Sequence, residues 1–456
     1  MQEEVCGSLW IFDLFYVRIE LRKQQRVRKK ASMKSAEKLI FELDDEVYQL
    51  QLEDLYGSSH EAEHQTDRYI RMLQKYQIMF GDGEVQVYSA PGRTEIAGNH
   101  TDHQQGRVIA AAVTRDAAAV VSLGEDNKIW LYSEDYGAAD VDLSDLEPHP
   151  EEEGTTLALI RGVAAGLRKR QHLIGGFNAY VMSEVPGGSG LSSSAAFETL
   201  IGTIFSGLFN DNLISAEEIA LIGQYAENVY FGKPSGLMDQ MACSVGGACQ
   251  IDFGGTPKVS RIRLDPADHG YVLCITDTKG SHAGLTEHYA AVPAEMKIVA
   301  RQFGRTVLGD LREEELLDRA PEIREACGDR AFLRALHYVR ENCRVDEIAE
   351  ALENDDWELY LELIRASGDS SYKYLQNICV PADTEHQNLA VALAVSEAVL
   401  GAEGVARVHG GGFAGTIQAY VKKEAFLRYQ EAMDSLFGEG SCQVIRIRAV
   451  GGVQVL

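Results

Sequence analysis

A glycine- and serine-rich stretch at residues 185–196, VPGGSGLSSSAA, constrains this chain of 456 residues more than any other feature. Apolar side chains follow it at helical spacing, at Phe197, Leu200, Ile201, Ile204, Phe205 and Leu208. The pattern predicts a tight loop that feeds the N-terminus of a helix ending near residue 209. Such a junction presents unpaired backbone N–H groups, hydroxyls and the positive end of the helix dipole, which together favour a bound phosphate. A glycine turn capped by serine, without a ligand, has the same local pattern, so the rest of the chain must decide.

A second informative stretch follows a strand predicted over residues 84–90, which we expect to stop at Pro91-Gly92. Residues 92–106 then read as a polar loop punctuated by glycine. Within ten residues this loop offers a guanidinium, an amide, an imidazole and a carboxylate, on Arg93, Asn99, His100 and Asp102. The set suits recognition of several hydroxyls on one small polar ligand, although a solvated loop has a similar composition.

Two acidic side chains lie close together in the segment 226–241. Glu227 falls on a predicted helix, and Asp239 lies just beyond a turn that contains glycine and proline. The neighbours of Asp239 are apolar, so its carboxylate is expected to be partly desolvated or paired. Both situations make it a candidate functional residue.

Charge and cysteine content exclude several classes of partner and compartment. The formal net charge of −26 disfavours nucleic acid or an anionic membrane as a partner, because such binding requires a basic surface. The eight cysteines are scattered without a Cys-x-x-Cys pair, which favours reduced thiols in a cytoplasmic protein. We expect a monomer or a weak homo-oligomer.

The length predicts more than one domain. Residues 1–32 hold seven Lys or Arg against four acidic residues, unlike the acidic remainder, and we expect them to be an extension outside the fold. Residues 33–265 form a predicted N-terminal domain and residues 266–456 an α+β C-terminal domain. The second domain contains helices predicted over 312–327, 331–343 and 345–367 and a second glycine cluster at 410–415 that feeds a strand.

Four motifs together resemble the GHMP small-molecule kinases and, within them, the galactokinases. They are PGRTEIAGNHTD at 91–102, PGGSGLSSSAA at 186–196, AEN with GLMDQ at 226–228 and 236–240, and GGGFAG at 410–415. Weaker similarity at 334–345 extends the resemblance over about residues 84–456. It implies a two-domain α+β fold with mixed sheets, packed helices and an active site in the cleft between the domains. It also implies an ATP-dependent kinase that converts galactose to galactose 1-phosphate at the anomeric hydroxyl.

The resemblance further implies a role for each candidate residue. ATP phosphates would lie against the glycine loop, formed by Gly187, Gly188, Ser189, Gly190, Leu191, Ser192, Ser193 and Ser194. Mg²⁺ would be held by Ser194 and Glu227, because this hard cation takes few protein oxygens and keeps water and phosphate as its other ligands. Asp239 would accept the proton of the sugar hydroxyl, and Arg93 would keep Asp239 ionised and neutralise charge on the transferring phosphoryl group. The sugar would contact Asn99, His100, Asp102 and Tyr289.

The sequence departs from the galactokinase pattern at four positions within these motifs or directly after them. Galactokinases carry Glu where this chain has Asn99 and Tyr where it has His103, and Gly and Cys where it has Ala414 and Thr416. An asparagine both donates and accepts hydrogen bonds and has no charge, so it would tolerate a carboxylate that Glu would repel. One alternative is therefore a kinase for another sugar, such as a uronic acid or a substituted hexose.

Two further alternatives belong to other functional classes. Some galactokinase-like proteins are sensors that bind sugar and ATP without catalysis, but here the serine loop and Asp239 are intact. A kinase for mevalonate or homoserine is disfavoured by the His-Thr-Asp segment at 100–102.

Overall fold

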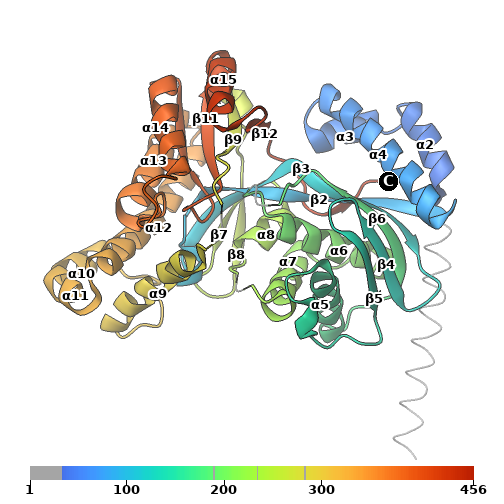
Figure 1. Ribbon diagram of the computed structural model, residues 1–456, viewed down its shortest axis with the longest axis horizontal. Coiled ribbons are helices and arrows are strands. Elements are labelled where there is room, and N and C mark those ends of the chain that lie inside the picture. Colours follow the sequence, from blue (N-terminus) through green and yellow to red (C-terminus); the bar gives the residue numbers. More distant parts are fainter. Residues whose placement is uncertain (1–32, 188–189, 234, 282–283) are drawn as a thin grey trace, which may run out of the picture.

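The computed structural model describes residues 33–187, 190–233, 235–281 and 284–456, so the predicted extension at 1–32 lies outside the described residues. Its larger sheet has nine strands, in the order β1-β2-β3-β6-β4-β5, with β13 paired to β2 and the β7–β8 pair attached to β3 (Figure 1). The pairing is antiparallel except for β4 with β6, which makes the sheet mixed. The strand bounds are β1 Lys34–Ser35, β2 Glu84–Ala97, β3 Arg107–Leu123, β4 Lys128–Ser133, β5 Gly137–Asp142, β6 Phe177–Ser183, β7 Ala248–Asp252, β8 Lys258–Ile262 and β13 Val453–Gln454.

Helices cover both faces of this sheet because successive side chains of its strands point to opposite sides. In β3, Ala117, Ala119 and Val121 pack with the first helical layer, whereas Ala118 and Val120 pack with the second. The first layer contains α5 Thr156–Lys169, α6 Ser193–Phe209 and α7 Ala216–Ala226, and α8 Met238–Val245 packs beside it. The second contains α2 Ala36–Asp44, α3 Gln49–Tyr56 and α4 Ser59–Phe80 (Figure 1).

A buried ion cluster ties the second helical layer to the sheet and to the C-terminal segment. Asp116 of β3 is fully buried between Arg68 of α4, at 2.6 Å, and Arg448, at 3.0 Å. Tyr56 of α3 donates a hydrogen bond of 2.7 Å to the same carboxylate. Burial raises the pKa of Asp116, but the two guanidinium groups outweigh it, so the pKa lies below its usual value.

The smaller sheet has four antiparallel strands in the order β10-β11-β9-β12. Their bounds are β9 Tyr271–Asp277, β10 Gly404–His409, β11 Thr416–Lys422 and β12 Cys442–Ile445. One face packs on α14 Asn388–Leu400 and α15 Phe426–Phe437. The other shares a core with β3 and with α12 Asp329–Glu353 and α13 Trp357–Ser370, so this core joins the two sheets. A further helical layer contains α9 Thr286–Gln302, α10 Glu313–Asp318 and α11 Ala320–Cys327.

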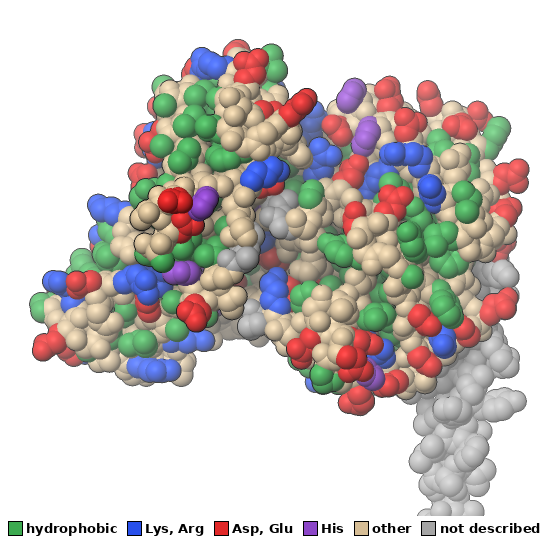
Figure 2. All heavy atoms as spheres, in the orientation of Figure 1, with side chains coloured by type: hydrophobic (Ala, Val, Ile, Leu, Met, Phe, Trp, Pro, Cys, Tyr) green, Lys and Arg blue, Asp and Glu red, His purple; other side chains and the backbone are tan. Residues whose placement is uncertain are grey.

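The two sheets and their helices form two masses with a hollow between them, and Lys and Arg side chains lie at its rim (Figure 2). The mixed sheets and packed helices confirm the predicted fold class. The division near residue 265 stays a prediction: β8 ends at Ile262, β9 begins in the other sheet at Tyr271, and β13 returns to the larger sheet. Among the described residues, no helix has the length and apolar character needed to cross a membrane.

Several predicted boundaries were wrong. The strand expected to stop at Pro91-Gly92 continues to Ala97, because two register shifts let β2 stay paired with β3 across the proline. The helix expected over 312–327 is divided at Arg319, since Pro321 starts a new helix. The break expected between residues 343 and 345 is absent: α12 is continuous to Glu353, and the chain turns at Asp355, which has a left-handed backbone.

Candidate active site

The glycine loop enters α6 as the sequence predicted, with α6 beginning at Ser193. Gly188 and Ser189 lie outside the described residues. Ser192 precedes the helix with a left-handed backbone (φ 60°), and its hydroxyl bonds Asp239 Oδ2 at 2.7 Å, with no bond from it to the helix N–H groups. The N–H groups of the first turn of α6 are therefore left without a side-chain cap from Ser192, which suits an anion. Tyr136 is exposed beside this loop, with its hydroxyl 3.3 Å from the position of a Cβ on Gly187.

Arg93 of β2 joins the first motif to the loop and to the carboxylate segment. Its Nε and Nη2 donate to Oδ1 and Oδ2 of Asp239, each at 2.7 Å, and its Nη1 donates to the Gly190 carbonyl. Burial raises the pKa of Asp239, but the ion pair and hydrogen bonds with Arg93 and the Ser192 hydroxyl outweigh it, so the pKa lies below its usual value. Asp239 is thus a carboxylate at neutral pH.

The side chains of Ser194 and Glu227 contact each other, and two ligands of one metal ion have to lie this close together. Ser194 Oγ donates to Glu227 Oε1 at 2.8 Å, and Lys233 Nζ lies 2.8 Å from the same oxygen. Glu227 stands in a π-helical turn, Glu227–Phe231, that continues α7. A hydroxyl and a carboxylate are oxygen ligands of the kind that Mg²⁺ prefers. The ion pair with the Lys233 ammonium shows that the Glu227 carboxylate attracts positive charge at this point. The donor chemistry therefore fits the cation.

Glu198 is a buried carboxyl group at this site that our sequence analysis missed. It is fully buried, and the Gln240 amide donates both to Glu198 Oε2 at 3.0 Å and to Glu227 Oε2 at 2.8 Å. Burial, and then the nearby Glu227, raise the pKa of Glu198 well above its usual value. The signal was its position four residues after Ser194, on the same face of α6.

His100 and Tyr289 converge on the second glycine cluster, which forms the hairpin between β10 and β11. His100 Nε2 lies 3.0 Å from the Gly411 carbonyl, and the Tyr289 hydroxyl donates to the Gly412 carbonyl at 2.7 Å. A Cβ on Gly411 would lie 2.9 Å from the Tyr289 ring, so glycine is needed for this approach. The geometry brings two of the four predicted sugar-contacting residues together.

Asp102 lies against the segment that carries Asp239. A Cβ on Gly236 would overlap Asp102 Oδ2, so the absence of a side chain at 236 lets the carboxyl group approach. Burial, with a smaller contribution from the charge of Asp239, raises the pKa of Asp102 to about 6.

Asn99 is fully buried, and both the NH₂ group and the oxygen of its amide form hydrogen bonds with the protein. Its Nδ2 donates to Glu95 Oε1 at 3.0 Å and to the Gly410 carbonyl at 2.6 Å. Its Oδ1 accepts from Asn377 at 2.8 Å and from Ser371 at 3.4 Å. Because an amide has two N–H donors and two lone pairs, these four bonds use its whole capacity. A direct sugar contact for Asn99 stays a prediction, and its observed contacts are those of a residue that holds the loop.

Two further residues missed in the sequence hold this loop from α12. Glu341 Oε1 accepts from the Gly98 N–H at 3.1 Å, and His337 Nε2 lies 2.9 Å from the Asn99 carbonyl. Burial raises the pKa of Glu341, but Arg344 above all outweighs it, so the pKa is lowered to about 2. The sequence offered only the weak similarity around 334–345 as a signal.

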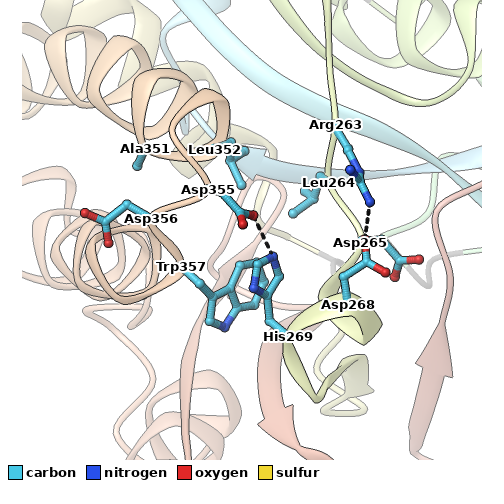
Figure 3. Close-up of a pocket in the computed structure, with 10 residues that line it drawn as sticks. All are labelled: Arg263, Leu264, Asp265, Asp268, His269, Ala351, Leu352, Asp355, Asp356 and Trp357. Atoms are coloured by element: carbon cyan, nitrogen blue, oxygen red, sulfur yellow. Dashed lines mark hydrogen bonds and ion pairs between the residues drawn. The ribbon is translucent and has the colours of Figure 1, made fainter.

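A small cavity beside the predicted domain boundary is lined by none of these residues (Figure 3). There the His269 ring stacks in parallel on Trp357, with centroids 4.4 Å apart, and lies 3.5 Å from Asp355. The cavity volume of about 30 Å³ has room for about one or two water molecules, and so for neither a sugar nor a nucleotide.

Comparison with known proteins agrees with this geometry. The model of the GHMP kinases N terminal domain matches residues 158–247, and that of the galactokinase galactose-binding signature matches residues 74–123. The galactokinase of Actinobacillus pleuropneumoniae is 33% identical over 353 residues, which cover 77% of this chain and 89% of that protein. The chain belongs to the galactokinase family. It is an ATP-dependent sugar kinase, a phosphotransferase acting on a sugar hydroxyl.

Other galactokinases and solved structures extend the match. The Streptomyces coelicolor galactokinase is 30% identical and covers 82% of the chain and 94% of its own length. The crystal structure of Lactococcus lactis galactokinase complexed with galactose has a TM-score of 0.72 at 28% identity, covering 84% and 98% of the two chains. A mevalonate kinase from Methanococcus jannaschii, at 18% identity and a TM-score of 0.57, covers 80% and 99% and shares the fold alone.

Proposed function

We propose that this galactokinase family member transfers the γ-phosphoryl group of ATP to the anomeric hydroxyl of galactose. The observation that carries the proposal is the contact of Asp239 with both Arg93 and Ser192. The Asp239 carboxylate thereby connects three parts of the chain: strand β2, which carries the first motif, the glycine loop, and the segment 236–240 that contains Asp239 itself. A phosphoryl donor on the loop and a hydroxyl beside Asp239 would be held close to each other, and such positioning supplies much of the catalysis in phosphoryl transfer.

In the proposed reaction the sugar hydroxyl gives its proton to Asp239 as the sugar oxygen attacks the γ-phosphorus, and the bond from that phosphorus to the bridging oxygen breaks, so that ADP leaves. Arg93 keeps Asp239 ionised before the transfer and places a guanidinium near Gly190, where negative charge builds on the phosphoryl group. The loop residues, including Gly188 and Ser189, would bind the phosphates through backbone N–H groups and hydroxyls. Tyr136 offers an exposed aromatic face beside the loop for the base of the nucleotide.

Ser194 and Glu227 would hold Mg²⁺, which when bound would neutralise charge on the ATP phosphates. Lys233 leaves Glu227 room for this, because its side chain is 56% exposed and can turn into solvent. Gln240 keeps the second Glu227 oxygen fixed. A cytoplasmic location and a monomeric or weakly oligomeric state stay predictions from the sequence.

The surroundings of Asn99 favour galactose over a uronic acid. The uronic acid hypothesis rests on Asn99 as an uncharged contact of the sugar, but both of its N–H groups are bonded to Glu95 and Gly410, so neither is left to donate to a sugar carboxylate. His100, Asp102 and Tyr289 present the donors and acceptors suited to neutral hydroxyls, and the relatives are named galactokinases.

A panel of phosphoryl acceptors, three sugars and one hydroxy acid, tests the proposal. ADP release would be measured with galactose, glucose, galacturonic acid and mevalonate at matched concentrations. We expect galactose to have the highest kcat/KM. A higher value for galacturonic acid would support the alternative sugar, and no turnover with any acceptor would support the sensor.

A further inference from the structure

A continuous hydrogen-bonded chain runs from the helical layer of the smaller sheet to the second glycine cluster. The Leu308 N–H donates to Gln104 Oε1 at 3.1 Å, and Gln104 Nε2 lies 3.1 Å from His103 Nδ1. His103 Nε2 lies 3.2 Å from His100 Nδ1, and His100 Nε2 lies 3.0 Å from the Gly411 carbonyl. Three side chains of one loop, those of Gln104, His103 and His100, thus connect two backbone groups from distant parts of the chain.

The two backbone ends fix the direction of every bond in the chain. A backbone N–H can only donate, so Gln104 turns its oxygen to Leu308 and its NH₂ group to His103. His103 Nδ1 must then accept, which leaves its proton on Nε2. At the other end a carbonyl can only accept, so His100 carries its proton on Nε2 and accepts at Nδ1. The two proton assignments are consistent at the bond between the rings, where His103 Nε2 donates and His100 Nδ1 accepts.

We infer that His103 is a positioning residue for sugar recognition, which holds the proton of His100 on Nε2, facing the second glycine cluster. The inference rests on the proposed function, in which this loop binds galactose. His100 then meets the sugar as a hydrogen-bond donor, and a sugar oxygen takes the place of the Gly411 carbonyl. The galactokinase pattern has a tyrosine at position 103, so this two-ring arrangement is a property of this chain.

Burial supports a neutral pair. It lowers the pKa of His100 to about 4 and that of His103 to about 3, and in His103 the neighbouring His100 adds to the effect. Both rings therefore stay uncharged at neutral pH, as the directions of the hydrogen bonds require. Gln104, which links the Leu308 N–H to His103, is itself fully buried.

Two measurements test the inference. The first is a two-bond ¹H–¹⁵N spectrum of the full chain labelled at histidine, with His100→Gln to assign the signal. We expect His100 to carry hydrogen on Nε2 and a bare Nδ1. Hydrogen on Nδ1, or a charged ring at neutral pH, would overturn the inference whether or not galactose is the substrate.

The second compares His103→Phe, which removes both polar contacts, with His103→Gln, which keeps a donor and an acceptor. We expect KM for galactose to rise about three- to tenfold in His103→Phe, the value of one hydrogen bond, and to recover in His103→Gln. We expect kcat and KM for ATP to change less than about twofold. His386→Gln, at an exposed histidine, is the matched control.

An unchanged KM for galactose in His103→Phe, or an equal loss in all kinetic constants, would contradict a positioning role. If His103→Phe fails to fold, the spectrum of the unaltered chain and the kinetics of His103→Gln are decisive. Loss of galactose affinity in His103→Gln, with the His100 proton still on Nε2, would overturn the inference. A wild-type chain without galactose turnover would refute the proposed function but leave the spectroscopic test intact.

Discussion

Arg93 donates two parallel hydrogen bonds to Asp239, from Nε to Oδ1 and from Nη2 to Oδ2, both 2.7 Å long. The two residues are 146 positions apart in the chain. A paired fork of this kind fixes the orientation of the carboxylate as well as its charge. It therefore leaves one face of Asp239 in a defined position beside the glycine loop.

Replacement of Arg93 by Gln should lower kcat by about 10²- to 10³-fold, the effect of removing one preorganised charge donor. Burial of Asp239 would no longer be offset, so its pKa should rise. In the wild type the pKa lies below its usual value, so kcat at saturating galactose is kept until the pH falls below the ordinary aspartate range. In Arg93→Gln the acid limb of kcat at saturating galactose should move to higher pH.

Steady-state kinetics across pH would check this, with Arg93→Lys as the matched variant that keeps the charge but loses the fork. An acid limb at the same pH in Arg93→Gln and the wild type would refute the role of Arg93 in keeping Asp239 ionised.

Galactose affinity should depend on pH through Asp102, whose pKa is raised to about 6. The carboxylate accepts hydrogen bonds above this pH and loses that capacity when it is protonated. From pH 7 to pH 5 the ionised fraction falls about tenfold, so KM for galactose should rise by about the same factor. In Asp102→Asn the KM should be high and nearly constant over this range; a KM that still follows pH in this variant would assign the dependence to another group.

Replacement of Glu227 by Gln should raise the Mg²⁺ concentration needed for half-maximal rate by at least about tenfold, since a neutral amide is a poorer ligand for a hard cation. Titration of activity with Mg²⁺ at saturating ATP would measure this. Glu63→Gln, at an exposed position on α4, should leave the titration unchanged. An unaltered Mg²⁺ requirement in Glu227→Gln would remove Glu227 from the metal site.

Replacement of Asp116 by Asn should lower the free energy of unfolding by about 3–5 kcal/mol, because Arg68 and Arg448 would keep their charges without a buried counter-charge. Urea unfolding followed by circular dichroism would measure the change. Asp54→Asn, at an exposed position on α3, should change the free energy of unfolding by less than about 0.5 kcal/mol. Equal stability of the two variants would show that the ion cluster does not stabilise the second helical layer.

The sequence was informative where chemistry is local. A helix that follows the glycine loop and ends near residue 209 could be predicted from spacing over a dozen residues, and the structure has α6 there. Asp239 could be singled out because a carboxylate among apolar residues needs a partner, and the structure supplies Arg93.

The environment of Asn99 could not be predicted, because its partners Asn377 and Gly410 lie 278 and 311 residues away. Only the tertiary fold brings them together and uses the amide completely, which weakens the alternative of a uronic acid and leaves galactose as the preferred sugar. The boundary of α12 failed for a related reason: residues 343–345 contain no glycine or proline, and packing keeps the helix intact to Glu353.

The most direct test is a ³¹P NMR time course with ATP, Mg²⁺ and galactose, run with the wild type and with Asp239→Asn. We expect the wild type to form galactose 1-phosphate, and the variant to form it about 10²- to 10⁴-fold more slowly while galactose binding is retained. Wild-type rates in Asp239→Asn, or phosphate on another hydroxyl of the sugar, would contradict the account.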